Sequence, residues 1–382
     1  KKNVINNFCI SVQSNWEGCT SCHAGYGWVD ASFDFSDVEA VDCLVCHDRS
    51  GTYVKGDGGF PEPGVDLALA AGSVGPSTRE NCGGCHFRGG GGDAVKHGDL
   101  DPSLVNPQPR VDVHMGRHAM VCTDCHGGEH HRILGRSISV SVDKADRISC
   151  VDCHAREPHG DARLNAHTDA VACQTCHIPQ VALREATKMH WDWSAAGQDL
   201  GDDPYTYLKK KGRFVYEKEL TPEYAWFDGM ADRYIMGDPI DTATATVLNP
   251  PRGSIRDPEA TIWPFKVHRG KQIYDAVYRY LLVPKTYGEG GYWEEFDWDK
   301  AARLGSEATN LAYSGRYAFA ATEMYWPLTH MVEPKEKSLR CLDCHSEDGL
   351  LDWASLGYPG DPVRWGGREA LRVASARGGE TR

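Results

Sequence analysis

Seven copies of one short motif, Cys-x-x-Cys-His, constrain this 382-residue chain more than any other feature. They use 14 of its 15 cysteines, and each Cys-x-x-Cys pair is followed directly by a histidine. Zinc ribbons, thioredoxin-like sites and disulfide frameworks do not require that histidine, whereas covalent attachment of a c-type heme does. The seven copies are Cys19–Cys22–His23, Cys43–Cys46–His47, Cys82–Cys85–His86, Cys122–Cys125–His126, Cys150–Cys153–His154, Cys173–Cys176–His177 and Cys341–Cys344–His345.

The spacing inside the motif has a geometric reason. Two thiols three residues apart reach the two vinyl groups on one edge of a porphyrin and form thioethers with them. The adjacent imidazole then lies beneath the iron as its proximal ligand. We therefore predict seven c-type hemes, and porphyrin should form much of the apolar interior. The 41 glycines and 20 prolines indicate many turns and short connections around these cofactors.

The motifs are distributed unevenly along the chain. Residues 1–180 carry six of them, residues 181–340 carry none, and residues 341–382 carry the last. We expect the three segments to form one compact unit. The heme-poor segment holds seven of the 11 tryptophans and 13 of the 16 tyrosines. These rings suit packing against porphyrins, and an electron relay through them is the alternative.

Helices are expected within the heme-poor segment. Apolar residues at helical spacing from Ile273 to Leu281 predict one helix, which Pro284 would stop. A second helix is expected from Lys300 to Tyr325, closed by Trp326 and Pro327. The predicted fold is therefore mainly α-helical, with extensive irregular structure.

The supply of histidine is large enough for two imidazoles on nearly every iron. Seven of the 17 histidines belong to the motifs. An iron held between two imidazoles is a low-potential electron carrier without an open coordination position. The histidines outside the motifs are His97, His114, His118, His130, His131, His159, His167, His190, His268 and His330. Of these, the expected distal ligands are His114, His118, His131, His159, His167, His268 and His330.

Two further features are not needed in a purely conducting chain. Four glycines at 89–92 allow the backbone to pass close to a flat surface, and they lead to Asp93, Lys96 and His97. The run is either a flexible exposed loop or a device that presents these side chains. Cys9 is the one cysteine outside the motifs. An unpaired cysteine in an oxidising compartment is either buried and inert or used for its thiolate chemistry.

The charge and hydropathy of the chain limit its partners. The formal net charge of −13 argues against nucleic acid and anionic lipid. An anionic substrate would need a local cluster of positive charge. No stretch approaches the ~20 apolar residues of a membrane span. Because this kind of heme attachment is completed outside the cytoplasmic membrane, we expect a periplasmic or extracellular protein.

Several stretches resemble the octaheme tetrathionate reductase family. The resemblance covers nearly the whole chain and includes the surroundings of Cys9, the first attachment motif through Trp28, and the glycine run through Asp99. It also includes the motif at Cys173 with the Ile178-Pro179 that follows, residues 264–272, residues 323–327 and the closing motif.

This resemblance implies a heme-packed fold related to hydroxylamine oxidoreductases. It implies one catalytic heme, attached by Cys19 and Cys22, with His23 as the proximal ligand and Lys96 as the distal ligand. Asp93, Cys9 and Asn6 match residues that line the pocket beside it. The family has eight hemes, so we expect a further attachment segment upstream of Asn6.

The family's reaction is the reduction of tetrathionate to two thiosulfates. It implies a small inorganic anion as substrate, and a cytochrome or quinol dehydrogenase as electron donor. Two alternatives remain open on the sequence. One is reduction of nitrite or hydroxylamine at a weakly ligated heme. The other is a non-catalytic conductor, such as a homo-oligomer or a subunit of a cytochrome filament.

Overall fold

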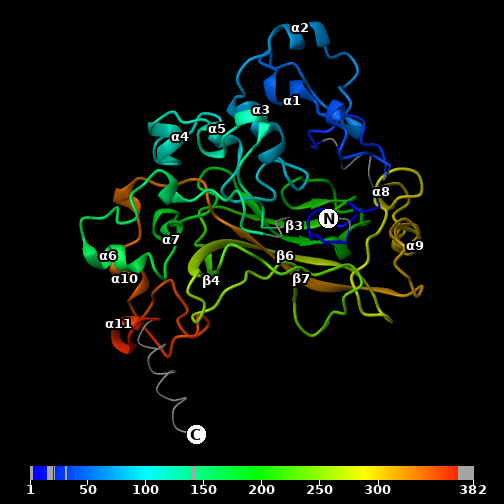
Figure 1. Cartoon of the computed structure of the whole chain (residues 1–382). Coiled ribbons are helices and arrows are strands. Elements are labelled where there is room, and N and C mark those ends of the chain that lie inside the picture. The colour runs from blue at the N-terminus through cyan, green and yellow to red at the C-terminus, as the bar shows by residue number, and fades with distance from the viewer. Residues whose placement is uncertain (1–2, 15–19, 21, 31, 139–142, 369–382) are drawn as a thin grey trace.

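The structure is a computed structural model that describes residues 3–14, 20, 22–30, 32–138 and 143–368. Cys19, which is part of the first attachment motif, lies outside the described residues. Short helices carry five of the motifs: α1 (Cys43–His47), α3 (Arg79–His86), α5 (Cys122–His126), α7 (Cys173–His177) and α10 (Cys341–Cys344). The motif at Cys150 begins in a 3-10 turn, Cys150–Asp152. In Figure 1 these elements form an arc, from α1 at the top through α3 and α5 to α7 and α10 at the left.

Local capping explains why so short a helix forms at a motif. Asp42 precedes α1 and its carboxylate accepts a hydrogen bond from the Leu44 amide, 3.0 Å away. Thr78 and Asn81 cap the start of α3 reciprocally. The remaining helices are also short: α2 (Leu67–Gly72), α4 (Val113–Arg117), α6 (Ala162–His167), α8 (Tyr292–Glu295), α9 (Trp298–Thr309) and α11 (Pro362–Trp365). Helices of this length depend on tertiary contacts, because isolated ones are marginal in water.

The heme-poor segment forms a seven-stranded sheet. Its strands are β1 (Thr187–Asp192), β2 (Tyr207–Leu208), β3 (Gly212–Glu217), β4 (Glu223–Phe227), β5 (Thr246–Val247), β6 (Thr261–Asp275) and β7 (Tyr317–Pro327). The order is β2-β3-β1-β6-β7-β5. The long β6 and β7 are antiparallel neighbours at the centre of Figure 1. Along its other edge β6 pairs first with β4, antiparallel, and then with β1, in parallel.

The first helix predicted for this segment is wrong, and the second is confirmed only as far as Thr309. Ile273 lies in β6, and the chain turns back after Asp275, whose carboxylate accepts hydrogen bonds from two amides of the turn. In the second stretch, α9 ends at Thr309 because Asn310 takes the left-handed conformation, with φ +55°. The chain then enters β7. The expected mainly α-helical fold therefore holds only for the motif-bearing parts, and the sheet is the correction.

The largest hydrophobic core lies on this sheet and is rich in aromatic rings. Trp191 stacks on Trp193 with ring centroids 4.2 Å apart, and Tyr292 stacks on Trp298 at 3.7 Å. Phe8, from the N-terminal loop, is 1% exposed and packs into the same core. These rings thus build a protein core, where we expected packing against porphyrins. Among the described residues, no helix is long and apolar enough to cross a membrane.

Candidate heme sites and active site

Five pairs of histidine rings face each other in the described part of the chain. Each pair joins one motif histidine to one histidine from elsewhere, and the ring centroids lie 6.1 to 6.3 Å apart. The pairs are His47–His131, His154–His114, His126–His330, His177–His159 and His345–His167. Five of the seven expected distal histidines thus lie opposite a motif histidine.

The ring separation fits one iron between each pair. A metal–imidazole bond is about 2 Å long, so two rings on opposite sides of one metal have centroids about 6 Å apart. A cavity of about 390 Å³ also opens beside Cys43 and His47, where a porphyrin would be attached. The 14 described cysteines are all free thiols, and 12 of them belong to motifs with both thiols described. The residues present therefore fit c-type hemes.

Hydrogen bonds orient the paired rings for ligation. The Nδ1 atoms of His47 and His126 lie 2.9 Å from the carbonyl oxygens of Gly75 and Leu134. An Nδ1–H that donates to a carbonyl leaves Nε2 unprotonated and able to bind a metal. The same arrangement holds for Nδ1 of His345 with Asp361, His167 with the Arg163 carbonyl, His159 with Asn165, and His330 with Asp99.

The ring planes divide the pairs into two groups. We call His126–His330 and His177–His159 the near-parallel pairs, because their planes are 21° and 7° apart. The other three are the near-perpendicular pairs, with angles of 67° to 84°. Because orbital overlap between iron and imidazole depends on ring orientation, the two groups should differ electronically.

Cysteines of successive motifs lie side by side. The thiols of Cys22 and Cys85 are in hydrogen-bond contact, as are Cys82 with Cys122 and Cys150 with Cys173. Cys125 and Cys153 interact electrostatically, as do Cys176 and both cysteines of the last motif. The attachment edges of neighbouring hemes are therefore adjacent, in one sequence from the first described motif to the last. Cys46, from the second motif, interacts electrostatically with Cys82 and Cys85 of the third motif.

His23 has a different setting from the paired histidines. Its ring lies among the rings of Trp28, Phe33 and Phe35, with centroids 4.6, 6.0 and 5.7 Å away. Its Nδ1 accepts a hydrogen bond from the Gly25 amide, at 2.9 Å. Aromatic side chains thus surround the proximal ligand that we expect at the catalytic heme.

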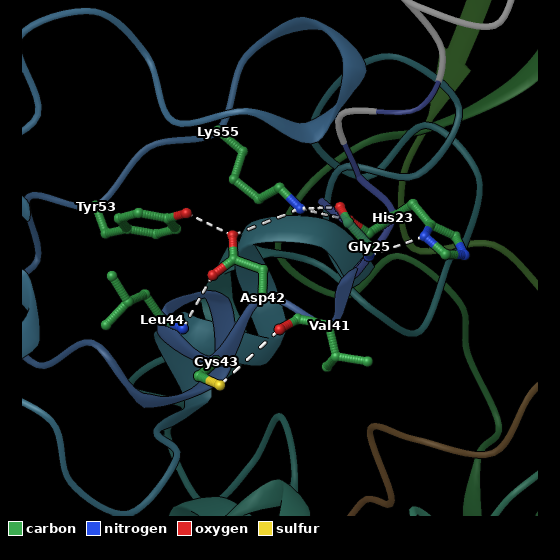
Figure 2. Close-up of polar contacts among 8 residues, drawn as sticks. All are labelled: His23, Gly25, Val41, Asp42, Cys43, Leu44, Tyr53 and Lys55. Carbon is green, nitrogen blue, oxygen red and sulfur yellow. Dashed lines mark hydrogen bonds and ion pairs between the residues drawn. The ribbon is translucent and has the colours of Figure 1, made fainter. Parts of the chain in front are cut away.

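A buried ion pair fixes the backbone at this proximal ligand. Figure 2 shows the Nζ of Lys55 donating to the carbonyl oxygens of His23 and Gly25, at 2.6 and 2.8 Å. The same Nζ lies 3.7 Å from the carboxylate of Asp42, which also accepts from Tyr53. Because Asp42 caps α1, this network ties the loop at His23 to the next attachment motif.

Lys96 lies in a pocket built by the glycine run. A Cβ added at Gly89 would lie 3.2 Å from Cδ of Lys96, and one at Gly90 would lie 2.9 Å from Val95 and 3.2 Å from Phe8. The glycines are therefore needed for close packing around this lysine. Burial lowers the pKa of Lys96, and its Nζ lies 4.6 Å from the ring centroid of Trp326. A neutral amine is the form that can bind a metal.

The structure brings Cys9 to Lys96 and to the first attachment motif. Cys9 interacts electrostatically with Lys96 and with Cys22. Burial raises the pKa of its thiol, while the neighbouring lysines act in the opposite direction. Asn6 positions this cysteine, because its side-chain oxygen accepts hydrogen bonds from the amides of Phe8 and Cys9, at 2.7 and 3.2 Å.

Three predicted site residues have other surroundings. Asp93 is exposed and forms an ion pair with Arg88 at 2.9 Å, so it lies at the rim of this region. His118 is exposed at the end of α4. His268 is 0% exposed within β6 and stacks on Phe8 at 3.7 Å. Both of its ring nitrogens are buried without a hydrogen-bond partner among the described residues, and none of the described ring contacts places a motif histidine opposite it.

His86 and His97 are two further histidines that interact electrostatically with Lys96. Among the ring contacts of the described residues, none pairs His86 with a second histidine. His86 interacts electrostatically with His126, His330 and Lys96. The ring of His97 faces Trp326 at 5.0 Å, and burial lowers its pKa to about 3.

Two buried lysines, Lys188 and Lys266, and the half-buried Lys211 were missed by the sequence analysis. Lys266, which is 1% exposed, donates to the carbonyl oxygens of Val95 and Lys96, at 2.9 and 3.1 Å, and so holds the turn that carries Lys96. Lys188 and Lys211 both interact with Cys9. A register shift between Lys188 and His190 interrupts the strand alternation of β1, and such bulges re-aim side chains. No sequence pattern marks them.

The comparisons with known proteins agree with this arrangement. Residues 188–348 match the family described as bacterial cytochrome c. The crystal structure of an octaheme cytochrome c from Shewanella oneidensis superposes with a TM-score of 0.89 and 52% sequence identity, over 95% of this chain and 85% of that one. An uncharacterized protein of Archaeoglobus fulgidus is 30% identical over 142 residues, which are 32% of this chain and 48% of that protein. The chain thus matches about half the length of that relative.

The attachment motifs, the paired histidines and these matches define a multiheme c-type cytochrome. Its cofactor is heme c, with seven attachment motifs in this chain. The chain belongs to the octaheme cytochromes c, the family of the Shewanella protein.

Proposed function

We propose that this protein reduces tetrathionate to thiosulfate beside Lys96 and Cys9. The observation that carries the proposal is the convergence of a half-buried lysine, a thiol and the first attachment motif in one neighbourhood. The five histidine pairs account for electron carriers that bind no substrate. Lys96 is therefore the residue that sets this site apart.

The hemes, when bound, supply one-electron carriers along the chain. The adjacent cysteines indicate an order in which electrons pass from the motif at Cys341 towards the motif at Cys22. We propose that a cytochrome or a quinol dehydrogenase donates them, in the periplasm or outside the cell.

Lys96 would hold the heme attached at the first motif, and that heme would supply electrons to the substrate. A primary amine at the end of four methylenes moves more easily than an imidazole locked by an Nδ1 hydrogen bond. As a free amine, Lys96 would take up a proton and add positive charge beside the substrate. The bonds from Lys266 to the Val95 and Lys96 carbonyls keep the lysine backbone in place during this movement.

Cys9 supplies the nucleophile in the proposed chemistry. Its thiolate attacks the central sulfur–sulfur bond of tetrathionate, releases one thiosulfate dianion and forms a Cys9 S-thiosulfonate. Two electrons then cleave the new sulfur–sulfur bond, which releases the second thiosulfate and restores the thiolate. Electrons and charge balance without a proton. Asn6 holds the Cys9 amide throughout.

The test combines two variants of the heme-loaded protein. Lys96→Met should abolish tetrathionate turnover and change the low-spin heme spectrum while the heme count stays the same. Cys9→Ser should abolish turnover without changing the spectrum. An unchanged spectrum in Lys96→Met would refute the ligand role, and unchanged turnover in Cys9→Ser would remove the cysteine from the chemistry.

Two other outcomes would assign a different function. Turnover of nitrite or hydroxylamine in place of tetrathionate would make the protein a reductase of nitrogen compounds. A conductor would show no turnover with any of the three acceptors, and each of its irons would be held by two imidazoles. Its five histidine pairs and adjacent cysteines would suffice for that role.

A further inference from the structure

Lys188 is a buried amine without an anionic partner. It is 3% exposed, and its Nζ lies 3.6 Å from the ring centroid of Trp191 and 3.5 Å from that of Phe214. In the described part of the chain, no oxygen atom lies within hydrogen-bond or ion-pair distance of this Nζ. Because a buried ammonium group without such a partner is costly, burial lowers the pKa of Lys188 to about 6 and favours the neutral amine.

Lys211 lies in the turn before β3 and interacts electrostatically with Lys188. A Cβ added at Gly91 would lie 3.5 Å from the Lys211 Nζ, so the lysine reaches the glycine run. Its backbone carbonyl accepts a hydrogen bond from the Trp191 indole at 2.6 Å, which links the turn to the strand that carries Lys188. Within the described residues, the Lys211 Nζ also has no carboxylate partner.

The titratable groups around these two lysines are almost all amines. Lys188 interacts electrostatically with Lys211, Lys266 and Cys9, and Lys211 interacts with Cys9 and Lys210. Among these partners, Cys9 is the one group that can become negative. A chain with a net charge of −13 has many carboxylates, yet none is among these partners. The region thus gathers amines without carboxylates, and it becomes positive when a bound anion favours their protonated form.

We propose that Lys188 and Lys211 bind an oxyanion beside Cys9, and that in turnover this anion is one sulfonate end of the sulfur compound. The bound anion favours the protonated form of both amines and is the partner that the protein does not give them. The identity of the anion rests on the proposed function, whereas the binding of a divalent sulfur oxyanion does not. Cation–π contacts hold the Lys188 Nζ in place before the anion arrives.

Equilibrium binding of thiosulfate to the oxidised, heme-loaded protein tests the site directly. We expect Lys188→Met and Lys211→Met each to weaken thiosulfate binding about tenfold or more, the effect of losing one charge-assisted hydrogen bond. Lys210→Met is the matched control, because it removes an exposed positive charge next in sequence and should leave binding within about twofold. Equal effects of all three variants would overturn the proposal, since they would indicate general attraction.

Further measurements separate this inference from the proposed function. With tetrathionate, Lys188→Met should raise KM more than it lowers kcat. The rate of Cys9 alkylation should change little, whereas lysines that act only on the thiolate would slow alkylation and leave thiosulfate binding unchanged. If thiosulfate binds through Lys188 and Lys211 but tetrathionate is not reduced, the site stands and the proposed function falls. If tetrathionate is reduced with unchanged KM in both variants, the anion site is refuted and the proposed function is not.

Misfolding of the variants can be recognised independently. Lys188→Met replaces a buried amine with an apolar side chain of similar length, so the variant should keep its heme content and unfold at a temperature no lower than the parent. A folded variant that binds thiosulfate as well as the parent would overturn the proposal.

Discussion

Replacing Gly90 with alanine tests whether the glycine run holds Lys96 by close packing. Gly90 has φ +87°, and an added Cβ would meet Val95 at 2.9 Å and Phe8 at 3.2 Å. Both neighbours are buried, at 2% and 1% exposure, so neither can move into solvent. An alanine with left-handed geometry costs about 1–2 kcal/mol. Crowding in a packed core adds about 1–3 kcal/mol.

Gly64→Ala is the matched control. Gly64 has φ +97°, and an added Cβ would meet no atom within 4 Å. This variant therefore carries the backbone cost alone, and we expect Gly90→Ala to be less stable than Gly64→Ala by about 1–3 kcal/mol.

Thermal unfolding and the heme spectrum give two independent measurements. A loss of this size should lower Tm by several degrees beyond the control. Because the new methyl group also lies 3.4 Å from Cβ of Lys96, Gly90→Ala should alter the low-spin signal of the heme that we propose Lys96 binds, and Gly64→Ala should not. Equal Tm values and identical spectra for the two variants would show that close packing of the glycine run does not position Lys96.

Three further predictions follow from other contacts. Electron paramagnetic resonance of the oxidised protein should show two rhombic low-spin hemes from the near-parallel pairs and three highly anisotropic ones from the near-perpendicular pairs; five alike would contradict the ring angles. Lys266→Met leaves the Val95 and Lys96 carbonyls without their hydrogen bonds from Nζ. In a urea titration it should lower the free energy of unfolding by about 2–4 kcal/mol. Lys271 is exposed on the same strand, and Lys271→Met should change this free energy by less than about 0.5 kcal/mol. Burial lowers the pKa of Lys188 from 10.5 to about 6, so between these pH values the unfolded chain holds a proton that the folded chain lacks. Stability should therefore rise with pH across that window, and Lys188→Met should lose this rise in Tm.

The chemistry of the cofactors was determined by the sequence alone. Each Cys-x-x-Cys-His motif is a local device in which three side chains within five residues attach one heme. The caps of the short motif helices, such as Asp42 before α1, are also formed by residues next to the helix in sequence. Five of the histidines expected as distal ligands lie opposite a motif histidine in the structure.

The sheet was decided by tertiary structure. Apolar residues around Ile273 fit a helical spacing, but eleven residue pairs with β7 favour the strand. Local spacing cannot reveal a partner strand that begins more than forty residues later. Likewise, nothing near His268 in sequence shows that Phe8 covers its ring.

The pairing of each distal histidine and the positive site beside Cys9 also depend on the fold. Lys188 points inward because the register of β1 shifts beside it, and Lys211 meets it from a separate turn. Residues 9, 96, 188 and 211 are far apart in the chain, so only its folding brings their charges together. Local covalent chemistry can be read from neighbouring residues, whereas an electrostatic site requires the distances that packing sets.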